Sequence, residues 1–127
     1  MAEHNELGKY GEEVAAQLLM SKGYSIIARD WRYGRSKSDI DIIAKTPDQA
    51  TIVFVEVKTR RPYTKVPAFY SIDRKKMYHI CRAANWYIIW NHITEAIRFD
   101  AIFVYVDRTT RRTTTQHYEN AFMPVSF

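Results

Sequence analysis

The residues best suited to chemistry in this chain are a carboxylate and an ammonium group, two positions apart on a predicted strand. Residues 52–61 are rich in β-branched and aromatic side chains and contain no glycine or proline. Alternation along a strand sends Phe54, Glu56, Lys58 and Arg60 to one face and the intervening valines to the other. A charge inside a domain is costly unless it is paired or holds a metal. Glu56 and Lys58 therefore need partners from other segments.

Two further carboxylates are candidates for this role. Asp41 lies fifteen positions before Glu56, on a predicted strand over residues 39–45. In an antiparallel hairpin, Asp41 can share a face with Glu56 and Lys58. Glu12 shares a predicted helix with Gly8, Gly11 and Ala15. It either points inward from this small-residue side, or is merely a favourable acid near the positive end of the helix.

Carboxylates brought close together repel each other and are hard to keep ionised without a cation. Oxygen ligands suit Mg²⁺ or Mn²⁺, and such an ion polarises a phosphoryl oxygen and lowers the pKa of bound water. Lys58 would stabilise the charge that develops during phosphodiester hydrolysis. In the alternative interpretation, Asp41 and Glu56 form an ordinary ion network with Lys58 and nearby arginines. The residues themselves favour neither interpretation.

The elements that would position these side chains follow from hydrophobic periodicity and turn residues. A first helix is predicted over residues 6–22, with Asn5 as its N-cap and Gly23 just past its end. A second helix is predicted over residues 72–91, with Ser71 as its cap. Strands are predicted over 24–31, 39–45, 52–61, 97–106 and 111–118. The order helix, three strands, helix, two strands predicts one α/β domain over residues 1–127.

Composition narrows the class of protein. The chain has 127 residues and a formal net charge of +5, which favours an anionic partner such as nucleic acid. A single cysteine, Cys81, excludes an internal disulfide. We expect a cytoplasmic protein, because neither a signal peptide nor an apolar run of membrane-spanning length is apparent. Trp86, Tyr87 and Trp90 recur at helical spacing, which favours core or a dimer surface over a base-stacking platform.

The ordered series of motifs resembles the PD-(D/E)XK nucleases. Residues 54–60, Phe-Val-Glu-Val-Lys-Thr-Arg, closely match the YraN-like branch, whose members are predicted endonucleases similar to archaeal Holliday-junction resolvases. The chain departs from the family pattern at Ser38-Asp39, where Gly-Glu is usual. The likeness extends over nearly the whole chain and includes Gly8, Gly11-Glu12, Ala15, Gly23-Tyr24, Asp39 to Ile43, Lys76, Ala84, Arg98-Phe99-Asp100 and Asn120-Ala121-Phe122.

The resemblance implies a restriction-endonuclease-like core, with a central mixed five-stranded sheet flanked by helices in the order α-β-β-β-α-β-β. It also implies that Glu12, Asp41 and Glu56 are metal ligands for Mg²⁺ or Mn²⁺. Lys58 would be the catalytic lysine. Lys76 matches a recurrent family lysine and is expected to contact phosphate.

The expected function is metal-dependent endonuclease activity on DNA, with branched DNA as one candidate substrate. Resolving a junction needs two cuts, so a homodimer is expected. The alternatives are a non-catalytic nucleic-acid-binding module with the same fold, and a structural or partner-binding domain. The other candidate phosphate contacts are Arg35, Lys37, Arg60, Arg61, Lys65, Arg74 and Lys75.

Overall fold

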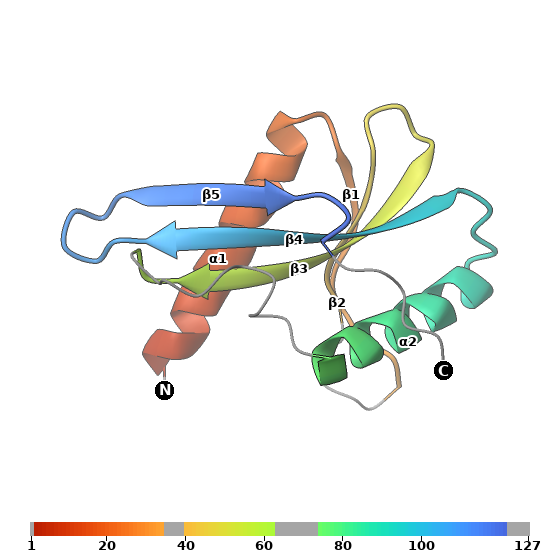
Figure 1. Ribbon diagram of the computed structural model, residues 1–127, viewed down its shortest axis with the longest axis horizontal. Coiled ribbons are helices and arrows are strands. Elements are labelled where there is room, and N and C mark those ends of the chain that lie inside the picture. Colours follow the sequence, from red (N-terminus) through yellow and green to blue (C-terminus); the bar gives the residue numbers. More distant parts are fainter. Residues whose placement is uncertain (1, 35–39, 63–73, 122–127) are drawn as a thin grey trace.

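The computed structural model describes residues 2–34, 40–62 and 74–121. Its elements follow the predicted order, and helices lie on both sides of one sheet (Figure 1). The sheet has the strand order β1-β2-β3-β4-β5, in which β3 and β4 are parallel and the other neighbours antiparallel. This confirms the predicted α/β class and mixed five-stranded sheet. The elements are α1 (Ala2–Ser21), β1 (Ser25–Trp31), β2 (Ile40–Lys45), β3 (Thr51–Arg60), α2 (Arg74–Trp90), β4 (Ala96–Val106) and β5 (Thr113–Tyr118).

The central strand β3 is covered on both faces, as its valine-rich sequence predicts. Val53 and Val55 pack with Leu19 of α1 in one core cluster. Phe54 points to the opposite face and packs with Ile80 of α2 in the other. The alternation therefore directs Glu56, two residues after Phe54, to the side of the sheet that α2 covers.

The ends of α1 differ from the prediction at one end only. Gly23 adopts a φ of +90° and its N–H donates to the Met20 carbonyl at 3.0 Å, so it ends the helix as expected. At the other end, α1 begins at Ala2, so the prediction of Asn5 as N-cap is wrong. N-cap preferences are worth only about 1 kcal/mol, and nothing in residues 2–5 prevents a helix. The predicted cap of α2, Ser71, lies outside the described residues.

Strands β2 and β3 stay paired over only part of their length. The pairs run from Lys45–Ile52 to Ile42–Val55, whereas β3 remains paired with β4 up to Arg60. Within the described ranges, no strand pairs with the second half of β3 on the side of β2. Neither α1 nor α2 combines the length and apolarity that a membrane-crossing helix needs.

Candidate metal centre

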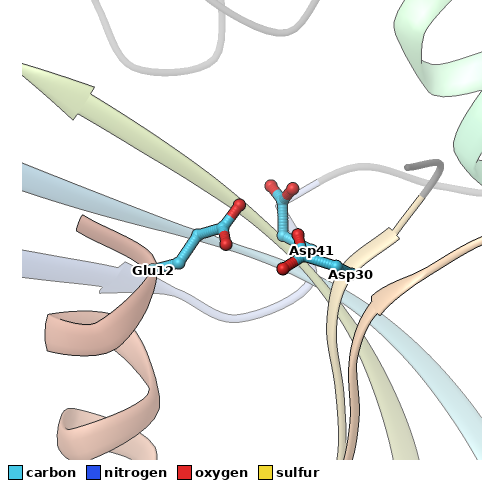
Figure 2. Close-up of side chains that lie close together, drawn as sticks. All are labelled: Glu12, Asp30 and Asp41. Atoms are coloured by element: carbon cyan, nitrogen blue, oxygen red, sulfur yellow. The ribbon is translucent and has the colours of Figure 1, made fainter. Parts of the chain in front are cut away.

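Three carboxyl groups from three elements converge beside the point where β2 leaves β3. They belong to Glu12 of α1, Asp30 of β1 and Asp41 of β2, and one oxygen of each lies within 4.8 Å of the others. Figure 2 shows the Glu12 side chain extending from α1 toward the two aspartates, which come from neighbouring strands. The structure therefore brings Glu12 and Asp41 together, as the metal-site interpretation requires. It adds Asp30, which the sequence pattern did not indicate.

Asp30 and Asp41 meet because both strands change their alternation at these positions. Asp30 has a left-handed backbone, with a φ of +50°. It lies between the pairs Arg29–Ile42 and Trp31–Ile40, which places it opposite Asp41. A positive φ is uncommon for residues other than glycine, although aspartate tolerates it better than most. A local backbone distortion thus places two acidic side chains next to each other.

The Asp41 carboxylate replaces part of the missing ladder between β2 and β3. Its Oδ2 accepts a hydrogen bond from the Val57 backbone N–H at 2.8 Å. In the register of the last pair, Ile42–Val55, Asp41 lies opposite Glu56, and the two carboxyl groups hydrogen-bond. The predicted hairpin geometry is therefore present, and Asp41 links Glu56 to Glu12 and Asp30.

Glu56 is 4% exposed and lies between two lysines. Its Oε1 is 3.6 Å from Nζ of Lys58, two residues along β3, and 3.8 Å from Nζ of Lys76 on α2. Lys58 and Lys76 are 19% and 38% exposed, so both ammonium groups border solvent. Of the three predicted ligands, Glu56 is the one outside the converging trio, because it faces these two lysines.

The position of Glu12 depends on a close approach of α1 to β3. A Cβ atom at Gly11 would overlap the Thr59 hydroxyl oxygen, so only glycine allows the helix to lie this near the strand. At Gly8 an added Cβ would have no neighbour within 4 Å, so the close approach occurs at Gly11 and not at Gly8. The close contact at Gly11 places the next residue, Glu12, inward. The alternative of a purely solvent-facing acid does not fit this position.

Crowding of the acids changes their protonation. Burial, followed by the charge of Asp41, raises the pKa of Glu56 to about 8. Burial, followed by the charges of Asp41 and Asp30, raises the pKa of Glu12 to about 7. Burial also raises the pKa of Asp41, although the hydrogen bond from Val57 opposes it. Raised pKa values are expected for buried neighbouring carboxyls that share protons and lack a sufficient counter-charge.

The donor set fits a hard divalent cation. All four groups are carboxyls, and oxygen-only ligands suit Mg²⁺ or Mn²⁺. A cation would offset the burial and the mutual repulsion that raise the three pKa values. Beside the cluster, a hollow of about 240 Å³ leads from solvent to Glu12 and Lys58, with Gly8, Thr59 and Arg60 in its lining. A ligand larger than water therefore has access to Glu12 and Lys58.

The predicted phosphate contacts are only partly gathered around this centre. Arg60 lines the hollow with Lys58, and Lys76 contacts Glu56. Arg74 and Lys75 are exposed at the start of α2. Arg61 lies elsewhere, because it lines a separate hollow with Arg108 at the turn between β4 and β5. Arg35, Lys37, Asp39 and Lys65 lie outside the described residues.

A second charged cluster is satisfied internally, which indicates a structural role. Asp100 is fully buried and accepts hydrogen bonds from Arg98, from His117 and from the Asn120 backbone N–H. Burial raises the pKa of Asp100, but these donors outweigh that effect and hold it below its ordinary value. The Arg98-Phe99-Asp100 motif therefore ties β4 to β5 and to the segment that follows it.

Comparisons with known proteins agree with the resemblance seen in the sequence. A UPF0102 protein of Flavobacterium psychrophilum is 39% identical over 122 residues, covering 96% of this chain and 98% of its own. A UPF0102 protein of Bacteroides thetaiotaomicron is 38% identical over 127 residues, the full length of both chains. The structure of Pyrococcus furiosus SfsA in complex with Ca²⁺ aligns with a TM-score of 0.37 at 15% identity, over 91% of this chain and 63% of that chain. This last likeness is too weak to support any inference about the site.

The family model described as "Uncharacterised protein family UPF0102" matches residues 11–104. This span contains Glu12, Asp30, Asp41, Glu56 and both lysines of the centre. The chain therefore belongs to the uncharacterised family UPF0102, the YraN-like family that its motifs resemble.

Proposed function

We propose that this chain is a nuclease that hydrolyses phosphodiester bonds in DNA with the help of Mg²⁺ or Mn²⁺. The observation that carries the proposal is the convergence of Glu12, Asp30 and Asp41 within 4.8 Å, linked through Asp41 to Glu56 and its two lysines. An ordinary ion network balances each acid with a base. Among the described residues, the ammonium groups of Lys58 and Lys76 lie near the four carboxyls, and Arg29 adds a positive charge near Glu12. The carboxyls outnumber these bases, which favours a divalent cation.

Each group has a role in this proposal. Glu12, Asp30 and Asp41 would hold the cation, and Glu56 would join them when its carboxyl turns from the lysines. The bound ion supplies Lewis-acid polarisation of a phosphoryl oxygen and a water of lowered pKa. Lys58, in the lining of the hollow, would place a positive charge near a bound phosphate and would stabilise the additional negative charge of the transition state. Lys76 holds the phosphate from the α2 side.

The substrate would be held by its backbone charge. Arg60 lines the same hollow, while Arg74 and Lys75 extend the basic surface along the start of α2. Binding is therefore expected to weaken steeply with salt, whereas cleavage depends on the acids and Lys58. The proposal extends to branched DNA as the substrate and to a homodimer as the active form, because symmetric resolution of a four-way junction needs two active centres.

Cleavage of a substrate panel tests the proposal. Linear duplex, flapped duplex and a four-way junction are incubated with Mg²⁺ or Mn²⁺, with binding followed separately by fluorescence anisotropy in chelator. Asp41→Asn and Glu56→Ala should abolish cleavage, and Lys58→Ala should reduce it by about a hundredfold or more, while binding is retained. Lys9→Ala, an exposed lysine on α1, serves as the matched control and should cleave normally.

Two other outcomes would replace the proposal. Salt-sensitive binding without cleavage of any substrate under either metal would assign the chain to non-catalytic nucleic-acid-binding modules. Absence of both binding and cleavage would leave a structural or partner-binding domain. In that case the acids would be an ion network with Lys58 and Lys76.

A further inference from the structure

An aromatic surface lies on α2 and on the chain that follows β1, and it consists of Tyr33, Trp86 and Trp90. We propose that this aromatic surface stacks the unpaired bases of single-stranded DNA beside the cleavage centre. The inference rests on the proposed function, and it narrows the substrate class to DNA with a single-stranded segment.

The three rings contact one another, and Trp90 is the most exposed of them. Tyr33 and Trp86 lie with centroids 5.0 Å apart and planes 17° from parallel. Trp90 leans against Trp86 at 5.4 Å and 60°, and it is 57% exposed. Tyr87, by contrast, is buried against Phe54. Of the two predicted places for these aromatics, core or a dimer surface, Tyr87 is in the core, whereas Trp90 is exposed and outside it.

The aromatic surface continues a line of positive charge. One stripe of α2 carries Lys75, Arg82, Trp86 and Trp90. Successive members are seven, four and four residues apart, which is about two turns and then one turn each, so they lie on the same side of the helix. The stripe is cationic in its first half and aromatic in its second, and α2 contains no acidic residue. At 1.5 Å per residue it spans about 22 Å, the length of roughly six nucleotides spaced 3.4 Å apart. Cations for the phosphates and rings for the bases are the two features of single-strand binding sites.

The aromatic surface is directly connected to the carboxyl cluster. Tyr33 follows Asp30 by three residues, so at most about 10 Å of backbone separates the ring stack from a candidate metal ligand. The exposed side chain of Arg32 lies between them in the sequence. A strand whose bases stack on Tyr33 and Trp90 would thus extend its backbone toward the acids.

A second copy of this chain fits the aromatic surface less well. A two-fold interface places the same stripe on both sides, so Lys75 and Arg82 of both copies would face the interface with no acid on either helix to balance them. Like charges placed together at an interface oppose association. DNA supplies the negative charge that this helix lacks.

The test measures binding without cleavage, in chelator, by the anisotropy of fluorescein-labelled oligonucleotides. The probes are a twelve-residue thymidine strand and an abasic strand with the same number of phosphates. Trp90→Ala should weaken thymidine-strand binding about five- to hundredfold and leave the abasic strand unchanged, because only the former has bases to stack. Ile89→Ala is the matched control, since Ile89 is 54% exposed beside Trp90 but cannot stack, and it should bind both strands normally.

The proposal is overturned if Trp90→Ala binds both strands as the parent chain does, or weakens both equally. It is also overturned if Trp90→Ala and Ile89→Ala both convert a dimer to a monomer in light scattering, which would make this face an interface between copies. Retained folding of Trp90→Ala is checked by its urea midpoint. Failure of the proposed nuclease function has a different signature, namely base-dependent binding that Trp90→Ala weakens while no metal supports cleavage.

Discussion

Glu56→Gln is expected to stabilise the metal-free protein, and to do so more at pH 7.5 than at pH 5.5. Burial, followed by the charge of Asp41, raises the pKa of Glu56 from 4.5 to about 8. Between these two values the folded chain keeps a proton that the unfolded chain has lost. The contribution of Glu56 is therefore fully present below pH 4.5 and is lost as the pH rises toward 8. Glutamine does not ionise, and its amide still presents a donor to Asp41.

The magnitude follows from proton linkage. While Glu56 is protonated in the folded state and ionised in the unfolded state, each pH unit lowers the free energy of unfolding by about 1.4 kcal/mol. From pH 5.5 to 7.5 the parent chain should thus lose about 3 kcal/mol through Glu56, and Glu56→Gln should not. The difference in the free energy of unfolding between Glu56→Gln and the parent chain should therefore increase by about 3 kcal/mol from pH 5.5 to pH 7.5.

An ion network makes the opposite prediction. If Glu56 were ionised between Lys58 and Lys76, its replacement would leave two ammonium groups unmatched and cost about 3–5 kcal/mol. Urea unfolding in chelator at both pH values distinguishes the two. A variant that is less stable than the parent by a constant amount would refute the reasoning. Glu95→Gln is the control, because Glu95 forms an ordinary pair with Lys45 at 3.0 Å and its lowered pKa does not titrate in this range.

Three further predictions concern the residues that build the centre and the structural cluster around Asp100. Gly11→Ala should cost about 1–3 kcal/mol of stability and reduce cleavage, because its methyl group would meet the side chain of Thr59 on β3. Gly8→Ala should be neutral or stabilise by about 1 kcal/mol, and the urea midpoints of the two variants test this difference. Asp30→Asn should weaken Mn²⁺ binding in calorimetry by roughly tenfold or more, and Glu6→Gln, an exposed acid on the same helix as Glu12, should not. Asp100→Asn should lower the free energy of unfolding by about 3–5 kcal/mol, because the substitution leaves the charge of Arg98 without its buried partner. It should have no specific effect on metal affinity.

The parts of the fold that follow from residue periodicity were predictable from the sequence. In β3, alternation correctly separates the valines that pack on α1 from Phe54, which packs on the α2 side. It also places Glu56 and Lys58 on the same side of the strand, where Oε1 of Glu56 is 3.6 Å from Nζ of Lys58. Gly23 marks the end of α1 because a left-handed residue there strongly favours glycine. Each of these features depends on a repeating geometry that one sequence displays.

The parts that depend on departures from periodicity were not predictable. Asp30 reaches the centre through a positive φ, after a register irregularity between Ile26 and Ala28. Aspartate tolerates a positive φ better than most residues, but the sequence does not show which aspartate will adopt one, and isoleucine gives no sign of a register irregularity. The inward position of Glu12 depends on how closely α1 approaches Thr59, a tertiary distance that two glycines could only suggest. Nothing in the sequence distinguished Gly11, where contact occurs, from Gly8, where it does not.

A crystal soaked with Mn²⁺ and measured for anomalous scattering tests the central claim most directly. We predict a peak bonded to the Asp41 carboxylate and to at least one of Glu12, Asp30 and Glu56, with the peak lost in Asp41→Asn. A map without such a peak at a saturating Mn²⁺ concentration, with Glu56 still paired to Lys58 and Lys76, would contradict the claim and leave the acids as an ion network.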